Sequence, residues 1–216
     1  MTASGAATPS DWDERYAAPD YFYGTEPNDF LRSVADRIPP GRVLMLADGE
    51  GRNGVFLAGL GYQVTSVDRS PVGLAKARAL AVERGVTLTT IEADLAEHRI
   101  EPAAWDAVVL IFCHLPRPLR RAVHRRAVAG LKSGGALVLE AYTPAQLGRG
   151  TGGPRQIELL MTLAELREEL AGLDLVVARE LERDVIEGVG HGGPSSVVQV
   201  LGFRPTPDAA NRSPER

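Results

Sequence analysis

The chain has 216 residues, 44% of them hydrophobic and 24% charged, with 24 basic against 28 acidic side chains and a formal net charge of −4. This composition is typical of one folded domain with a sizeable core, and it excludes a wholly disordered chain and, because Cys113 is the only cysteine, a disulfide scaffold. The acidic balance gives no reason to expect nucleic acid as a partner, and without an apolar run of about 18 residues or a secretory pattern in MTASGAATPS we expect a cytoplasmic protein with no membrane partner.

The predicted domain covers residues 11–205, between a small polar tail at 1–10 and a charged tail at 206–216. Residues 11–40 precede the first predicted strand and are expected to form an N-terminal helix or lid. The aromatic residues at 21–23 within this segment either cover a bound ligand or simply pack against the core.

Short apolar runs then alternate with helical patterns, which is typical of βαβ units around a mostly parallel sheet. The predicted strands are Arg42–Ala47, Tyr62–Asp68, Val86–Glu92, Trp105–Phe112, Ala136–Tyr142, Leu173–Glu182 and Val197–Phe203. The predicted helices are Asn53–Leu60, Pro71–Arg84, Arg117–Leu131 and a last one that begins after Thr162 and ends near Leu170. Residues 143–161 form a long predicted loop of the kind that is usually functional or mobile, and the glycine-rich sequence EGVGHGGPSS predicts a turn between the last two strands.

A glycine-rich turn stands directly after the first predicted strand and opens a helix. Gly49, Gly51 and Gly54 satisfy the spacing G-x-G-x-x-G, in which glycine permits a tight turn and close approach of a ligand to the backbone. Asp68 ends the second predicted strand, where a carboxylate can accept hydrogen bonds from both ribose hydroxyls of a nucleoside. The order of strand, turn, helix, strand and acid favours a nucleoside cofactor over a plain turn with a solvent-facing Asp68.

NAD and S-adenosylmethionine (SAM) both bind at a turn of this kind. The sequence has no phosphate-binding P-loop, and no tyrosine is followed four residues later by the lysine that a short-chain dehydrogenase requires. Asp94 and Leu95 follow the third predicted strand, where Asp94 can accept from an adenine amino group while Leu95 packs on the ring. The alternative is an aspartate that caps a turn. The sequence LKSGG at 131–135, before the fifth predicted strand, also favours a SAM-binding protein.

Residues 11–205 resemble class I SAM-dependent methyltransferases, of the small TehB-like (tellurite-resistance) and thiopurine-methyltransferase-related group. The resemblance rests on the stretches WDERY, YGTEPNDFL, GEGRNGVFLA, VDRSPVGLAKA, ADL, IFCHLP, LKSGG and EAYTP. Met45 stands where these enzymes commonly have an acidic residue, Ala47-Asp48-Gly49 replaces a frequent G-C-G, and Ser133 replaces a proline. Asp48 is expected to compensate by holding the amino end of the cofactor.

The resemblance implies a Rossmann-like, doubly wound α/β sheet of seven strands in the order 3-2-1-4-5-7-6, with strand 7 antiparallel, in a single domain. Ligands bind such sheets at the carboxyl ends of the parallel strands. This places one group of side chains at the rim of a shared site: His114, Tyr142, Gln146, Glu187 and His191. The implied cofactor is SAM, and the implied cofactor-binding residues are Asp48, Gly49, Glu50, Gly51, Arg52, Asn53, Asp68, Arg69, Asp94, Leu95, Phe112 and Tyr23.

The two rim histidines each have a plain alternative. His114 is either a pocket residue or a packed histidine before Pro116, and His191 is either a pocket residue or part of a simple turn. Cys113 follows an apolar strand and is expected to be a small core residue rather than a nucleophile. The scattered histidines predict no metal site. The arginines at 117, 120, 121, 125 and 126 predict the solvated face of an amphipathic helix.

The resemblance implies SN2 transfer of the SAM methyl group to a small-molecule acceptor, such as a thiol or a chalcogen oxyanion that needs no strong base. If the acceptor must lose a proton, His114 or His191 is the expected helper. The D/N-P-P-Y box of amino-methylating nucleic-acid enzymes is absent. Two alternatives stay open, a non-catalytic SAM-binding or regulatory protein and an NAD-binding oxidoreductase. We expect a monomer or a homodimer.

Overall fold

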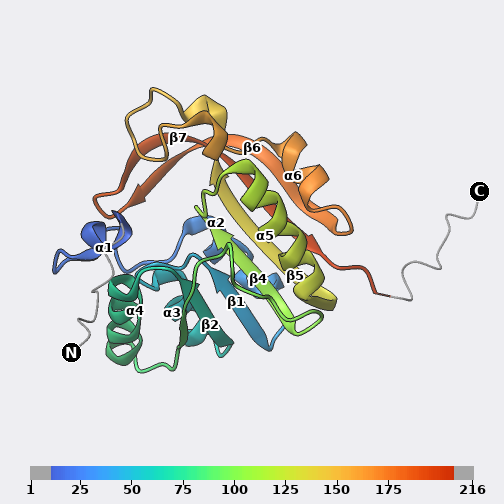
Figure 1. Cartoon of the computed structure of the whole chain (residues 1–216), viewed down its shortest axis with the longest axis horizontal. Coiled ribbons are helices and arrows are strands. Elements are labelled where there is room, and N and C mark those ends of the chain that lie inside the picture. The colour runs from blue at the N-terminus through green and yellow to red at the C-terminus, as the bar shows by residue number, and fades with distance from the viewer. Residues whose placement is uncertain (1–10, 207–216) are drawn as a thin grey trace, which may run out of the picture.

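The computed structural model describes residues 11–206, so the predicted tails lie, except for Thr206, outside the described residues (Figure 1). The strands are β1 Arg42–Leu46, β2 Gln63–Asp68, β3 Thr89–Glu92, β4 Trp105–Ile111, β5 Leu131–Tyr142, β6 Asp174–Glu187 and β7 His191–Phe203. The helices are α1 Asp11–Tyr16, α2 Asp29–Val34, α3 Arg52–Gly59, α4 Pro71–Glu83, α5 Arg117–Gly130 and α6 Leu163–Glu169, with short 3₁₀ turns η1 Ala35–Arg37, η2 Pro144–Gln146 and η3 Ile157–Leu159.

The seven strands form one sheet in the order β3-β2-β1-β4-β5-β7-β6. The pairs from β3 through β5 are parallel, whereas β7 runs antiparallel to both of its neighbours. The predicted fold class and strand order are therefore confirmed. Because β1, β2, β4 and β5 point the same way, the loops that follow them meet at one edge of the sheet.

Alternate residues of the central strands supply two separate cores. Leu44 and Leu46 of β1 pack toward α5 and α6, which cover one face of the sheet, whereas Val43 and Met45 pack toward α2, η1 and α3 (Figure 1). Burial on both faces explains why β1 and β4 are continuous apolar runs rather than alternating ones. Met45 thus occupies a core position inside the sheet.

The helix starts follow the capping signals of the sequence. The side chain of Ser70 accepts from the Gly73 amide ahead of α4, with Pro71 at the first helical position. Thr162 forms a capping box with Glu165 at the start of α6. These local bonds fix where α4 and α6 begin, and so where the preceding loops end.

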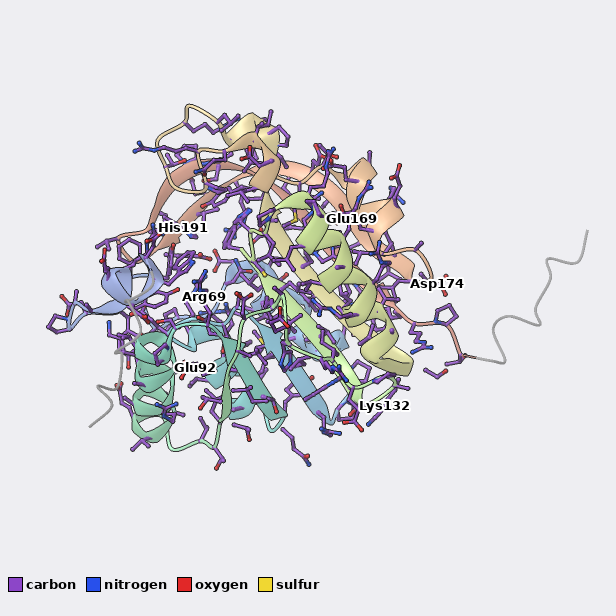
Figure 2. The ribbon with its side chains drawn as sticks, in the orientation of Figure 1. Arg69, Glu92, Lys132, Glu169, Asp174 and His191 are labelled. Carbon is purple, nitrogen blue, oxygen red and sulfur yellow. The ribbon has the colours of Figure 1, made fainter. Side chains whose placement is uncertain are left out.

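The last hairpin is longer than predicted. β6 continues to Glu187 and β7 begins at His191, which leaves only residues 188–190 as the turn. The glycines of EGVGHGGPSS indicated a longer loop, but most of this sequence pairs across the hairpin. His191 is therefore held in a strand rather than in a loop (Figure 2).

The arginines of α5 are not all solvated, which corrects the expectation for this helix. Arg120 is fully buried, and its guanidinium donates to Glu169 of α6 and to the Leu160 carbonyl. His124 contributes a further bond of 2.7 Å to the same carboxylate (Figure 2 labels Glu169). This buried ion pair joins α6 to α5 on the face of the sheet that they share.

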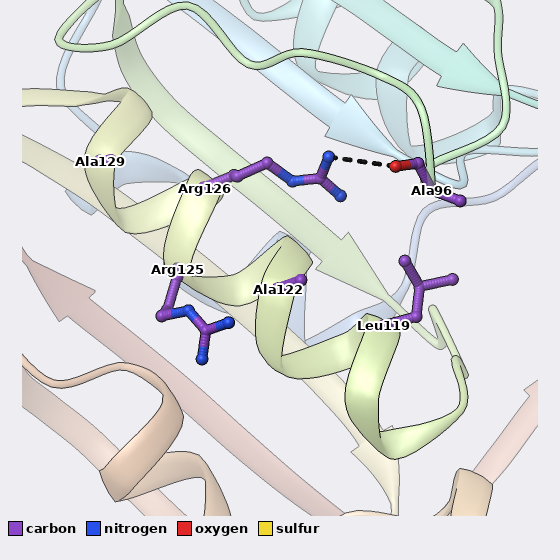
Figure 3. Close-up of a pocket in the computed structure, with 6 residues that line it drawn as sticks. All are labelled: Ala96, Leu119, Ala122, Arg125, Arg126 and Ala129. Carbon is purple, nitrogen blue, oxygen red and sulfur yellow. Dashed lines mark hydrogen bonds between the residues drawn. The ribbon is translucent and has the colours of Figure 1, made fainter.

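A shallow groove of about 350 Å³ lies between α5 and the segment that follows β3 (Figure 3). Arg126 reaches across it to the Ala96 carbonyl, and a second nitrogen of the same side chain donates to the Leu95 carbonyl. These bonds attach the segment after β3 to α5. In the part of the chain from 11 to 206, no helix is both long enough and apolar enough to cross a membrane.

Candidate functional site

The turn after β1 and the turn after β2 are tied together by Asp68. Its two carboxylate oxygens accept from the backbone amides of Gly49 and Ser70, each at 2.8 Å. Burial raises the pKa of Asp68, while the bonds from Ser70 and Gly49 act in the opposite direction. A carboxylate offers about four lone-pair sites, so Asp68 keeps capacity for further donors such as ribose hydroxyls.

Glycine is required at positions 49 and 51 of this turn for different structural reasons. Gly49 and Gly51 both have positive φ, +56° and +84°. A Cβ on Gly51 would lie 2.4 Å from the Cβ of Ala77, so this glycine lets the turn pack against α4. A Cβ on Gly49 would instead lie 2.6 Å from the hydroxyl of Tyr16. Of the two, it is Gly49 that faces the N-terminal segment covering the turn.

Asp48 lies inside the protein rather than at a ligand-facing position. Its carboxyl group bonds to Ser66 at 2.5 Å and accepts from the Gly54 amide at 3.3 Å. Burial raises the pKa of Asp48 to about 7, although the hydrogen bond from Ser66 lowers it. These contacts do not support the expectation that Asp48 holds the amino end of a cofactor, because its oxygens are already used between α3 and β2.

Glu50, Arg52 and Asn53 were expected to bind the cofactor, but their side chains bond to other parts of the protein. Glu50 accepts from the Phe22 amide at 2.8 Å and pairs with Lys76 at 2.7 Å. Arg52 pairs with Glu187 at 2.7 Å. Asn53 accepts from a backbone amide of the N-terminal segment. Any role of residues 50–53 toward a cofactor would therefore fall to their backbone.

The turn after β3 also serves the protein itself. The side chain of Asp94 accepts from the Ala96 amide at 2.8 Å, as an aspartate that caps a turn does. Leu95 is 8% exposed and packs in the core beneath α5, whereas Arg69 is exposed. Asp94 is itself exposed at the carboxyl edge, so its free lone pairs remain accessible there.

A buried polar network lies beside the glycine turn. The amide nitrogen of the Asn28 side chain donates to Glu140 at 2.5 Å and to Glu187 at 2.9 Å. Arg183 forms two bonds to Glu140, and Arg52 pairs with Glu187, so each carboxylate has its own guanidinium. The network holds the N-terminal segment, β5, β6 and α3 in one arrangement.

Aromatic side chains gather where β4, β5 and the β6–β7 hairpin meet. Phe112 stacks on Tyr142 with ring centroids 4.6 Å apart, and the ring of His191 stands edge-on to both at 4.7 Å and 5.3 Å. His114 stacks on Tyr142 at 5.7 Å, and Tyr23 lies 4.7 Å from His191. The structure thus brings the two predicted histidines together with Phe112 and Tyr23 in one group, which we call the aromatic cluster.

Phe112 is held in the left-handed region, at φ +52°. A non-glycine residue there costs on the order of 1–3 kcal/mol and persists only where its surroundings fix it. The Phe112 amide donates to the Glu140 carbonyl at 2.8 Å, and stacking on Tyr142 fixes the ring. Ala47, after β1, has the same conformation at φ +56°. Ala47 and Phe112 lie at the carboxyl edge of the sheet, whereas a third such residue, Ala103 at φ +49°, precedes β4.

Both histidines of the cluster have a fixed tautomer. His191 Nδ1 lies 2.8 Å from Glu187 and His114 Nδ1 lies 2.9 Å from the Leu159 carbonyl, and since both partners only accept, each Nδ1 carries a hydrogen. His114 Nε2 is buried without a hydrogen-bond partner. Burial lowers the pKa of His114 to about 4. Residues 11–206 contain no group of three or more histidine, cysteine, aspartate or glutamate side chains that could hold a metal.

Comparisons with known proteins match part of this chain to methyltransferases. Residues 43–135 match a family model described as a methyltransferase domain. The chain is 34% identical over 141 residues to a ubiquinone biosynthesis O-methyltransferase of Xanthomonas campestris pv. campestris, a match that covers 61% of this chain and 57% of the relative. The chain thus spans little more than half the length of the curated relatives it matches.

Residues 43–135 therefore belong to a methyltransferase domain family.

Solved structures share the fold of this chain. One, titled "Conversion of a Disulfide Bond into a Thioacetal Group during Echinomycin Biosynthesis", has a TM-score of 0.73 at 17% identity and covers 94% of this chain and 96% of its own. TehB from Haemophilus influenzae has a TM-score of 0.67 at 20% identity, over 82% of this chain and 61% of its own. At these identities the likeness concerns the fold alone.

The N-terminal segment covers the glycine turn. The ring of Tyr16 lies over Gly49 and against Gly73, and Asp13 bonds to the Ser70 side chain at 2.5 Å. Burial raises the pKa of Tyr16, and the nearby Asp68 carboxylate raises it further. Tyr16 was not singled out from the sequence, because a lone aromatic in a short helix gives no signal beyond packing.

Three other residues of this site were not predicted from the sequence: Asn28, Glu140 and Arg183. Glu140 is the one with a usable signal, because an acid inside the apolar run LVLEAY of β5 has to be paired if the strand is buried. Cys113 is buried in the core, and burial raises the pKa of its thiol to about 12, which agrees with a core role.

Proposed function

We propose that this chain transfers the methyl group of SAM to a small-molecule acceptor at the carboxyl edge of the sheet. The observation that carries the proposal is the chain of contacts from Arg52 through Glu187 to His191. It joins the helix that opens at the glycine turn to the aromatic cluster through a single carboxylate. A cofactor held at the turn and an acceptor held at the cluster would therefore be neighbours.

The residues at the turn fit the cofactor. Asp68 has unused lone pairs for the ribose hydroxyls. Gly49 has no side chain of its own to cover its backbone, and glycine also permits its positive φ. When bound, SAM supplies a methyl group already activated by a sulfonium. The contribution of the protein is then to align the acceptor with that methyl group and to exclude water.

The glycine turn and the aromatic cluster are both covered by other parts of the chain, which supports the exclusion of water. Tyr16 lies over Gly49, while a Cβ on Gly153, in the loop 143–161, would lie 2.7 Å from the ring of Tyr142. Gln146 holds this loop by donating to Thr151 and to a loop carbonyl. Ligands reach the edge of the sheet when these two covers are displaced.

The acceptor class is also a proposal. A thiol or a chalcogen oxyanion needs little activation, and the sequence resemblance to the TehB-like, tellurite-resistance group favours such an acceptor. TehB from Haemophilus influenzae has the same fold. An oxygen acceptor is suggested by the name of the curated relatives, ubiquinone biosynthesis O-methyltransferases. We also propose that the protein acts in the cytoplasm as a monomer or homodimer, without nucleic acid, and light scattering after gel filtration tests its oligomeric state.

The decisive experiment has two stages. Calorimetric titration with SAM and with NAD separates this function from that of an NAD-binding oxidoreductase, since we expect heat only with SAM. The second stage follows formation of S-adenosylhomocysteine with a thiol, selenite and catechol as acceptors. Binding of SAM without turnover of any acceptor in a broad panel would instead indicate a non-catalytic SAM-binding protein.

A further inference from the structure

The aromatic cluster contains a histidine that is arranged as a base. Resting on the proposed methyl transfer, we propose that His191 removes the proton from the acceptor, that Glu187 positions it, and that the acceptor is a hydroxyl group on an aromatic ring.

The hydrogen-bonding state of His191 leaves one nitrogen available. Its Nδ1 hydrogen is donated to Glu187, so the lone pair of the neutral imidazole is on Nε2. Within residues 11–206, the hydrogen bond found for the His191 ring is the one at Nδ1. A base needs such an unshared lone pair, fixed in direction by a bond at the opposite nitrogen.

Glu187 remains ionised beside His191. Burial opposes its ionisation, but hydrogen bonds from His191 and the charge of Arg52 outweigh burial and bring the pKa of Glu187 to about 2. An ionised carboxylate stabilises the imidazolium that forms when His191 takes a proton. Arg52 and Asn28 hold Glu187 in place from the other side, at 2.7 Å and 2.9 Å.

The surroundings of His191 favour a planar acceptor. The rings of Phe112 and Tyr142 are stacked, and His191 stands edge-on to both at interplanar angles of 67° and 86°. A Cβ on Gly152 would lie 2.8 Å from His191 Cδ2 and 3.2 Å from the Tyr142 hydroxyl, so the loop backbone covers this edge of the imidazole. An aromatic ring that displaces Gly152 would meet the nitrogen edge of His191 and the hydroxyl of Tyr142 together.

A base at this place distinguishes between acceptor classes. A chalcogen oxyanion is already charged, and a thiol ionises at a pKa near 8.5, whereas a phenol ionises near 10 and so gains most from a base. In the reaction, the aromatic O–H bond breaks and its proton passes to His191 Nε2. The oxygen forms a bond to the methyl carbon while the carbon–sulfur bond breaks, leaving its electron pair on a neutral sulfide. The proton is then lost from His191 to water.

His114 is the poorer base of the two. Its Nδ1 donates to a neutral carbonyl rather than to a carboxylate, and burial lowers its pKa to about 4. It therefore stays neutral, and its Nε2 has no hydrogen-bond partner among the described residues. The charged and titratable groups around His191 are Glu187, Arg52 and Arg183 on its Nδ1 side, and Tyr23, Tyr142 and His114 on its ring side.

The test compares phenols, led by catechol, with thiophenol, whose thiol is ionised at neutral pH without help. We expect His191→Phe, which keeps a ring in the cluster, to lower kcat with the phenols about 100-fold or more and to change kcat with thiophenol less than threefold. SAM affinity should stay within twofold. His98→Gln, which changes a histidine away from the cluster, is the matched control and should match the wild type with both acceptors.

Glu187 is tested by a pH profile, which a purely structural role would not move. Glu187→Gln removes the charge that stabilises the imidazolium, so the acid limb of kcat with the phenols should shift to lower pH while the maximum falls. Glu187→Asp should restore part of both. If His191→Phe does not fold, His191→Gln replaces it.

Two results would overturn the inference. Equal losses with phenols and thiophenol would make His191 a packing residue, and turnover of thiophenol or selenite without turnover of any phenol would refute the acceptor class. Failure of the proposed function is a different outcome, namely bound SAM with no acceptor methylated by the wild type.

Discussion

The buried carboxyl group of Asp48 should make the stability of this protein depend on pH in a direction opposite to that of most aspartates. Burial raises its pKa from 3.8 to about 7, so the folded protein holds the proton more tightly than the unfolded chain does. The resulting stability is complete below about pH 4 and is lost as the pH rises to about 7. The difference between the two pKa values corresponds to roughly 4 kcal/mol at 1.36 kcal/mol per unit.

Asp48→Asn removes this dependence while preserving the contacts. An asparagine oxygen can accept from the Gly54 amide, and its nitrogen can donate to Ser66 Oγ once that hydroxyl, which donates to Asp48 in the wild type, turns to accept. In urea denaturation we expect the variant to be more stable than the wild type by up to about 4 kcal/mol at pH 8, with the difference vanishing near pH 4. SAM affinity should change little.

Asp106 provides a control of opposite sign. Burial opposes its ionisation, but bonds from Lys132 and the Arg42 amide outweigh burial and lower its pKa. Its stabilising effect is present above the unfolded pKa and is lost as the pH falls, so Asp106→Asn should destabilise the protein at pH 8 and less so near pH 3. If Asp48→Asn changed stability equally at pH 5 and pH 8, the charge of Asp48 would not be the cause.

Asp68→Ala should weaken SAM binding in calorimetry about tenfold to a hundredfold, because it removes a charge-assisted acceptor of about 1.5–3 kcal/mol; unchanged affinity would remove the cofactor from this turn. Gly51→Ala should lower the free energy of unfolding by about 2 kcal/mol, since it strains a backbone at φ +84° and collides with α4; an unaltered urea midpoint would contradict the packing role. Ala47→Gly should relieve left-handed strain and stabilise by about 1 kcal/mol, and a lower melting temperature would show that its side chain matters more. S-adenosylhomocysteine should slow hydrogen exchange in both α1 and residues 143–161. Deletion of residues 1–16 should reduce SAM affinity more than the free energy of unfolding. Exchange rates in α1 that do not change with the ligand would show that α1 only packs against the domain.

The sequence predicted the parts of this fold that depend on local signals. Ser70 and Pro71 mark the start of α4 because a cap and a first-turn proline act within four residues. The strand order came through the resemblance, and it correctly placed His114 and His191 at one edge. The position of Asp68 at the end of β2 was also predicted, whereas its role toward a cofactor stays a prediction.

Long-range pairing is what the sequence could not reveal. The arginines of α5 looked like a solvated face because the partner of Arg120, Glu169, lies 49 positions later. The composition of EGVGHGGPSS is that of a loop, yet pairing between β6 and β7 outweighs the cost of glycine in a strand. Asp48 could not be placed for the same reason, because its partner Ser66 lies on the neighbouring strand.

The contacts of Asn28 have a consequence for the order in which the chain folds. Its side-chain amide bonds to carboxylates that lie 112 and 159 positions later in the sequence. During synthesis this residue therefore emerges long before either partner, and loop closure over such separations is slow. We expect the N-terminal segment to dock last, after β5 and β6 have paired with β7. The aromatic cluster and the glycine turn would then stay open to solvent until the final step of folding closes them.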